Sequence, residues 1–87
     1  MRRKEYQVQN DDGIDIRSSE VISDLASTFE CDIFLKHNQK EINVKSIMGF
    51  ISLALSKGAL IEIFFDGEDE EKAEKDIDVL LRERKLV

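Results

Sequence analysis

Four short stretches of the chain have the pattern of β-strands, in which apolar and polar positions alternate or β-branched and aromatic residues gather. They cover residues 4–9, 32–37, 40–44 and 60–65. In the first, Tyr6 and Val8 lie on one face of the predicted strand and polar residues lie on the other. Only Asn38 and Gln39 separate the second stretch from the third, so these two strands are expected to form a hairpin.

Three further stretches have the spacing of amphipathic helices. Within residues 18–29 the apolar side chains gather on one side of a helix: Val21, Ile22, Leu25, Ala26 and Phe29. Residues 46–56 predict a short helix, because Ser46 is a good N-cap and Gly58 a good stop. Asp69 is expected to cap a last helix with one apolar face, formed by Ala73, Ile77, Leu80 and Leu81.

The predicted order of elements is βαββαβα. Strands with one apolar face need one covering layer, so this order predicts an α+β fold. We expect an open-faced βαββαβα sandwich, in which a four-stranded antiparallel sheet carries three helices on one face and exposes the other to water. At 87 residues and 10.0 kDa the chain is expected to form a single domain, 1–87.

Composition narrows the classes of partner. The chain has 13 Lys and Arg against 19 Asp and Glu, a net charge of -6, which argues against direct nucleic-acid binding because Lys and Arg must neutralise phosphates there. No apolar run approaches the ~20 residues that cross a bilayer, and no signal-peptide pattern is present. We therefore expect a cytoplasmic protein without a membrane partner. One cysteine, Cys31, and one histidine, His37, cannot build a metal cluster, and no metal or cofactor is expected.

The junction from Gly13 to Ser18 joins the first predicted strand to the first helix. Free backbone amides and the positive end of the helix dipole point outward at such a place and attract anions. Glycines are too few here for a nucleotide-phosphate cradle. The simplest interpretation is that Asp15 caps the helix and that Arg17 is a solvated side chain.

A second junction begins at Ser46, whose hydroxyl is followed by four bulky apolar residues: Ile47, Met48, Phe50 and Ile51. A helix this short cannot bury all of them. If Phe50, Leu53 and Ala54 face the core, the remaining apolar side chains form a patch beside the serine hydroxyl. An ordinary buried helix with an ordinary cap is the competing interpretation.

The order of residues around these junctions resembles that of HPr, the histidine-containing phosphocarrier of the bacterial sugar phosphotransferase system. The resemblance runs over residues 3–83. It rests on Gly13, Ile14 and Arg17, on the hairpin 38–44, and above all on residues 45–49, 52–54 and 57–59, which are KSIMG, SLA and KGA. The resemblance implies the same open-faced sandwich that the hydrophobic pattern predicts.

The chain departs from the family where HPr proteins carry their phosphoryl group. The family motif is written G-I-H-A-R-P-A, and this chain has Asp15 at the place of the histidine. The small residue, the proline and the last alanine of the motif are matched by Ile16, Ser18 and Ser19. His37 is predicted at a strand end and does not replace the missing histidine. The chain is thus similar to histidine-lacking paralogues such as Crh, the catabolite-repression HPr-like protein, which act through a serine that matches Ser46.

The resemblance implies a non-catalytic regulatory module of carbon catabolite control. It implies that an HPr-type serine kinase/phosphorylase phosphorylates Ser46, and that the partners are a catabolite-control transcription regulator or phosphotransferase-system enzymes. Partners are expected to dock on five residues: Asp15, Arg17, Ile47, Met48 and Ile51.

Two other functions stay open. One is a phosphocarrier that uses Asp15 as an aspartyl-phosphate acceptor, and the other is an unregulated docking or decoy module. A further hypothesis is that the Asp15 carboxylate, held by the amides of residues 16–18 and paired with Arg17, permanently mimics phosphohistidine with a single charge. An enzyme is not expected, because no Ser, His and acid arrangement can be built around the isolated His37.

Overall fold

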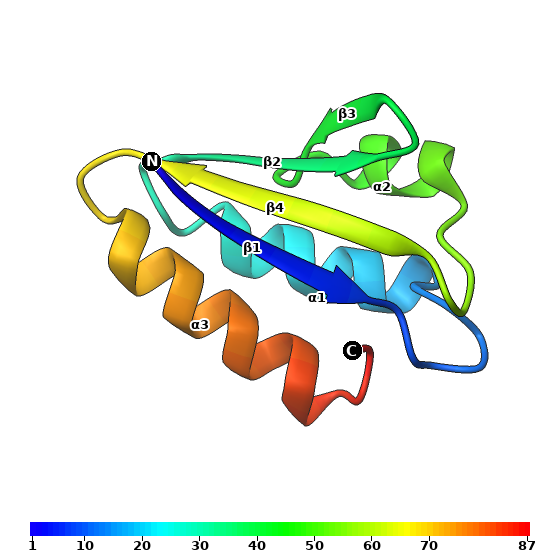
Figure 1. Cartoon of the computed structure of the whole chain (residues 1–87). Coiled ribbons are helices and arrows are strands. Elements are labelled where there is room, and N and C mark those ends of the chain that lie inside the picture. Colours follow the sequence, from blue (N-terminus) through cyan, green and yellow to red (C-terminus); the bar gives the residue numbers. More distant parts are fainter.

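The computed structural model describes residues 1–87 and contains four strands and three helices in the predicted βαββαβα order (Figure 1). Their bounds are β1 Arg2–Gln7, α1 Ile16–Ala26, β2 Asp32–His37, β3 Lys40–Asn43, α2 Ile47–Leu53, β4 Leu60–Asp66 and α3 Glu70–Glu83. The predicted first strand, 4–9, lies two residues too far along the chain, because pairing with β4 already begins at Arg2, opposite Phe65. The first helix begins two residues earlier than predicted, directly after Asp15.

The sheet has the strand order β1-β4-β2-β3, and every neighbouring pair is antiparallel. β4 therefore lies between β1 and β2, although it is the last strand in the sequence. The helices cover one face of the sheet, and α1 and α3 lie side by side beneath it in Figure 1. The predicted α+β sandwich with a four-stranded antiparallel sheet and three helices is confirmed.

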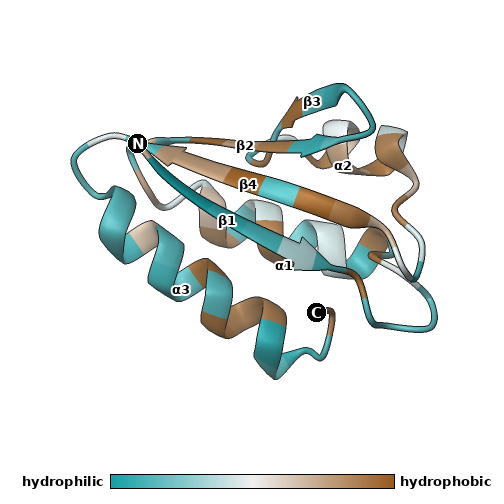
Figure 2. Ribbon diagram, in the orientation of Figure 1, coloured by the Kyte–Doolittle hydropathy of each residue, from teal (hydrophilic) through white to brown (hydrophobic).

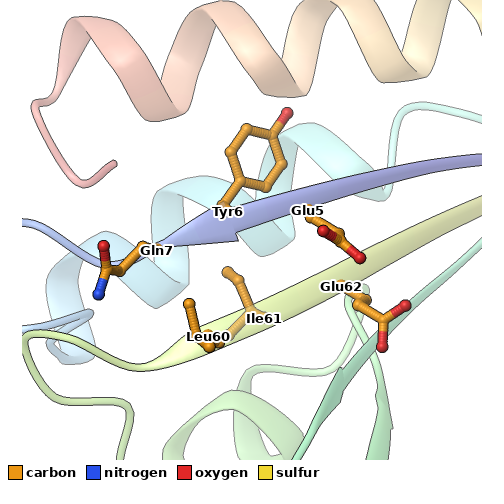
Figure 3. A pocket seen from close by; sticks show the side chains of 6 residues that line it. All are labelled: Glu5, Tyr6, Gln7, Leu60, Ile61 and Glu62. Atoms are coloured by element: carbon orange, nitrogen blue, oxygen red, sulfur yellow. The ribbon is translucent and has the colours of Figure 1, made fainter.

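The two faces of the sheet differ in burial because side chains alternate along each strand. In β4, Ile63 and Phe65 are at most 1% exposed and belong to a core of 20 buried apolar residues. On the neighbouring strand Tyr6 points toward α3, whereas Glu5 points away together with Glu62 (Figure 3). The face opposite the helices is thus the open face that the alternation predicts.

β1 is an edge strand with charged residues along its outer side. Hydrophilic residues dominate β1 and the first half of α3, whereas apolar residues lie along much of β4 (Figure 2). Arg3 pairs with Glu62 across the strand boundary at 2.6 Å, and Arg2 pairs with Glu74 of α3 at 3.2 Å. Exposed ion pairs add little stability, but charges along an edge oppose association with a second sheet.

The predicted hairpin between β2 and β3 is present. Its turn residues, Asn38 and Gln39, have φ angles of 48° and 68°. Positive φ at both central residues is what a tight type I′ turn requires, and its twist matches that of the two strands. Gln39 adopts this conformation although glycine would do so with less strain.

Asp69 does not cap α3 with its side chain, so this part of the prediction is wrong. Its carboxylate oxygens instead accept hydrogen bonds from the backbone amides of Glu30 and Cys31, at 2.8 and 2.9 Å. The Glu30 amide is the main cause of a lowered pKa at Asp69. Both oxygens are engaged by the loop before β2, which leaves neither for the helix, and Asp69 ties that loop to the start of α3.

Candidate functional site

The loop before α1 packs against the segment that follows α2. The Ile14 amide donates to the Leu55 carbonyl at 3.0 Å, and a Cβ atom at Gly13 would collide with the same carbonyl oxygen. Gly13 has a φ of +66°, which glycine adopts without strain. Asn10 closes the loop, because its carbonyl accepts from the Gly13 amide at 2.9 Å and its side chain donates to the Gly13 carbonyl at 2.8 Å. The segment that leads into α1 and the segment that follows α2 are therefore joined directly (Figure 1).

Asp15 is the N-cap of α1. Its backbone is extended, and Oδ1 accepts a hydrogen bond from the Ser18 amide at 2.8 Å. This bond, with the Ser18 hydroxyl and then the nearby charges of Arg17 and Arg84, lowers the pKa of Asp15 below its usual 3.8. The hypothesis places the amides of residues 16–18 around the carboxylate, but only that of Ser18 donates to it. The ion pair with Arg17 is absent, since no nitrogen of Arg17 lies within 4.0 Å of a carboxylate oxygen.

We expect the substitution Asp15→Asn to remove a pH-dependent part of the stability. A carboxyl group whose pKa is lower in the folded chain stabilises the fold above its unfolded-state pKa, and this contribution disappears as the pH falls through the folded-state value. In urea denaturation the wild type should therefore exceed the variant in unfolding free energy at neutral pH, and the difference should shrink in acid. A difference that stays constant down to acid pH would contradict this.

Ser46 is the N-cap of α2. Its φ and ψ are -105° and 113°, and its Oγ accepts a hydrogen bond from the Gly49 amide at 3.2 Å. The residue is exposed to solvent. The helix is only 7 residues long and ends at Leu53, and its C-cap, Ala54, has a left-handed backbone with a φ of 48°.

The apolar residues after Ser46 divide between core and surface. Phe50 and Leu53 are 3% and 8% exposed, whereas Met48 is 74% exposed and Ile51 40%. Ile47 is half-buried. The condition under which the patch is predicted, that Ala54 faces the core together with Phe50 and Leu53, is not met at Ala54, which is exposed because the helix ends before it and the chain turns there. Ser46 is thus followed by apolar side chains that are at least partly exposed at Ile47, Met48 and Ile51, and their role as a docking patch stays a prediction.

Ile16 is an exposed apolar residue that the sequence interpretation did not place on this surface. It is the first residue of α1, directly after Asp15, and is 63% exposed. No local signal indicates this exposure, because Ile16 lies one turn before Ser19, which is buried on the same helix face. We define the helix-junction surface as the five predicted docking residues together with Ile16.

His37 lies at the end of β2, as predicted, and belongs to the hairpin end of the sheet. Its Nδ1 lies 2.9 Å from the Leu60 carbonyl oxygen, and Nε2 lies 3.2 Å from the side-chain nitrogen of Asn38. If Asn38 donates to Nε2, then Nδ1 carries the proton and donates to Leu60. The imidazole thus links β2 to β4 and takes no part in the helix-junction surface.

A shallow hollow lies away from this surface. It is on the β1–β4 pair and is lined by Glu5, Tyr6, Gln7, Leu60, Ile61 and Glu62 (Figure 3). The carboxylates of Glu5 and Glu62 are both bound by Arg3. No cluster of three or more His, Cys, Asp or Glu side chains suits a metal ion, and no helix has the length and apolar character needed to span a bilayer.

Comparison with known proteins places this geometry in a family. The family model described as the PTS HPr component phosphorylation site matches residues 2–83, nearly the whole chain. The chain belongs to the HPr family. HPr proteins are non-catalytic phosphocarriers, and this chain is an HPr-like phosphocarrier or regulatory protein of the phosphotransferase system.

Solved HPr structures agree with this assignment. The histidine-containing phosphocarrier protein of Mycoplasma has a TM-score of 0.96 at 28% identity, with 99% of this chain and 98% of that chain covered. HPr-C-His from Thermoanaerobacter tengcongensis has a TM-score of 0.88 at 34% identity, with 99% and 96% covered. Crh of Bacillus subtilis, a catabolite repression protein described as an intertwined swapped dimer, has a TM-score of 0.74 at 32% identity, with 95% of each chain covered.

Proposed function

We propose that this chain is a regulatory HPr-family protein that carries no phosphoryl group on histidine and acts through phosphorylation of Ser46 and protein docking. The observation that carries the proposal is the contrast between the two helix starts. At α1 the N-cap is a carboxylate, Asp15, whose oxygen already accepts from the Ser18 amide. At α2 the N-cap is an exposed serine hydroxyl.

Phosphorylation suits Ser46 electrostatically. A phosphoserine carries about -1.5 to -2 charges, which are favoured at the start of a helix by the free amides and the dipole. The phosphate is attached to the oxygen that already accepts from the Gly49 amide, so α2 should be strengthened rather than unfolded. The main change is then a new charge beside the exposed Met48.

The proposed partners follow from the family. An HPr-type serine kinase/phosphorylase modifies Ser46, and the modified chain docks through Asp15, Arg17, Ile47, Met48 and Ile51 on phosphotransferase-system enzymes or a catabolite-control transcription regulator. The similarity to Crh, a catabolite repression protein, supports the second of these partners.

A paired phosphorylation assay tests the proposal. The chain is incubated with ATP and the serine kinase, and separately with phosphoenolpyruvate and the first enzyme of the phosphotransferase system, and each product is analysed by mass spectrometry. We expect one phosphate, at Ser46, in the first reaction and none in the second. Ser46→Ala should abolish the modification. Ser52→Ala removes another exposed serine of the same helix and should leave it unchanged.

The other outcomes contradict the proposal in distinct ways. A phosphate on Asp15 in the second reaction, labile to acid and to hydroxylamine, would identify a phosphocarrier that uses the aspartate. Absence of phosphate in both reactions would indicate an unregulated docking or decoy module.

A further inference from the structure

Ile16 stands beside the position from which HPr proteins transfer a phosphoryl group. It is 63% exposed, while Ile14, two residues earlier, is 8% exposed and is fixed by the hydrogen bond that its backbone amide donates to the Leu55 carbonyl. Asp15 lies between them and is held by the Ser18 amide. The backbone on both sides of Ile16 is therefore anchored, and its side chain projects from a fixed point.

The side chain of Ile16 is also stiff. A β-branched residue in a helix has one strongly preferred χ1 rotamer, so it cannot easily swing aside when a partner approaches. Any protein that brings a phosphoryl donor within bonding distance of residue 15 must also close over residue 16. A surface shaped for a small side chain at that place would overlap the extra carbons of isoleucine.

The exposed Ile16 adds to the apolar surface formed by α2. The Ile14 amide donates to the Leu55 carbonyl, which joins the segment before α1 to the segment after α2, and the last turn of α2 contains the 40% exposed Ile51. Of the six large apolar residues that are well exposed in this chain, three are Ile16, Met48 and Ile51. A partner that fits this surface needs an apolar recess over residue 16 and a cationic or hydrogen-donating group opposite the ionised Asp15.

We propose that Ile16 is a specificity-determining residue, which excludes the phosphoryl donor of the phosphotransferase system from the start of α1 by steric overlap. This inference rests on the proposed function, in which no phosphoryl group passes through residue 15. It adds a second barrier to transfer, because restoring a nucleophile at position 15 is not sufficient while isoleucine occupies position 16. Overlap with the extra carbons of one isoleucine side chain lowers the association constant of the two proteins by about ten- to hundredfold.

Three variants test the inference: Asp15→His, Asp15→His with Ile16→Ala, and Asp15→His with Leu60→Ala. Each is phosphorylated with phosphoenolpyruvate and the first enzyme, and kcat and KM for the variant are measured. In the reaction the bond between phosphorus and the donor atom of the enzyme breaks, a bond to the introduced imidazole nitrogen forms, and the imidazole N–H proton passes to the donor group. The third variant is the matched control, because Leu60 is a 69% exposed aliphatic residue on the open face of the sheet.

We expect the variant with Ile16→Ala to have a kcat/KM at least tenfold above the other two, mainly through a lower KM, because the substitution relieves docking rather than chemistry. Equal kcat/KM values for Asp15→His with and without Ile16→Ala would overturn the inference, and so would absence of phosphate in both. Thermal unfolding of each variant shows that the fold is retained. The serine kinase takes no part in this assay, so a failure of the Ser46 proposal is seen only in the kinase reaction.

Discussion

Replacing Phe65 by alanine is expected to lower the free energy of unfolding by about 3–5 kcal/mol. Phe65 is fully buried in β4, where it is paired with Arg2 of β1 and Ile33 of β2. Truncation removes a large apolar side chain from the core and leaves a cavity that anchored neighbours on both sides cannot fill. A chain of this length has a total stability of roughly 4–13 kcal/mol, so this one substitution removes a large part of it.

Phe64→Ala is the matched control for this prediction. Phe64 is the same residue type one position earlier, but it is half-buried on the open face, with the Lys36 ammonium 5.0 Å from its ring centroid. Partial burial and an exposed cation–π contact together predict a loss of about 1–2 kcal/mol. Urea denaturation of both variants checks the difference. Similar losses would show that the two faces of the sheet do not differ as the structure has them.

Replacing Gly13 by alanine is expected to lower the free energy of unfolding by about 2–5 kcal/mol, the sum of left-handed backbone strain and steric overlap. The φ of +66° disfavours any residue with a Cβ atom, and that atom would collide with the Leu55 carbonyl oxygen and lie 2.9 Å from the Ser56 Cα. Both groups are backbone, so neither can move without shifting the segment that follows α2. The hydrogen bond from the Ile14 amide to Leu55 should weaken at the same time.

Gly58→Ala separates the two causes. Gly58 also has a positive φ, +92°, but an added Cβ would meet no atom within 4 Å. The Gly58→Ala variant should therefore lose only the free energy that corresponds to backbone strain, about 1–2 kcal/mol. Equal losses for the two glycine variants in urea denaturation would mean that the loop before α1 can move away from α2. A matching loss of phosphorylation at Ser46 in Gly13→Ala alone would show that this contact also supports the start of α2.

The fold could be predicted from the sequence largely because its determinants are local. Alternation around Tyr6 and Val8 and the cap at Ser46 each depend on residues a few positions apart, and the structure agrees with them. The role of Asp69 depends instead on the amides of Glu30 and Cys31, 39 and 38 positions away, and no local pattern reports such a partner.

The candidate site was predictable to a similar degree. The caps at Asp15 and Ser46 follow from residue type and position. The exposure of Ala54 and Ile16 does not follow in this way. It depends on where α2 ends and on whether another element covers the first turn of α1. The absence of an ion pair between Asp15 and Arg17, by contrast, follows from a local rule, since side chains two positions apart do not face each other on a helix.

The place of β4 between β1 and β2 also determines when this protein can fold during its synthesis. β1 leaves the ribosome before any other strand, yet its pairing partner, Leu60–Asp66, follows more than fifty residues later. Only the β2–β3 hairpin, whose strands are two residues apart, can pair early. A nascent chain that stops before residue 60 therefore lacks the strand that joins β1 to the β2–β3 hairpin, so the four-stranded sheet can form only after β4 has emerged.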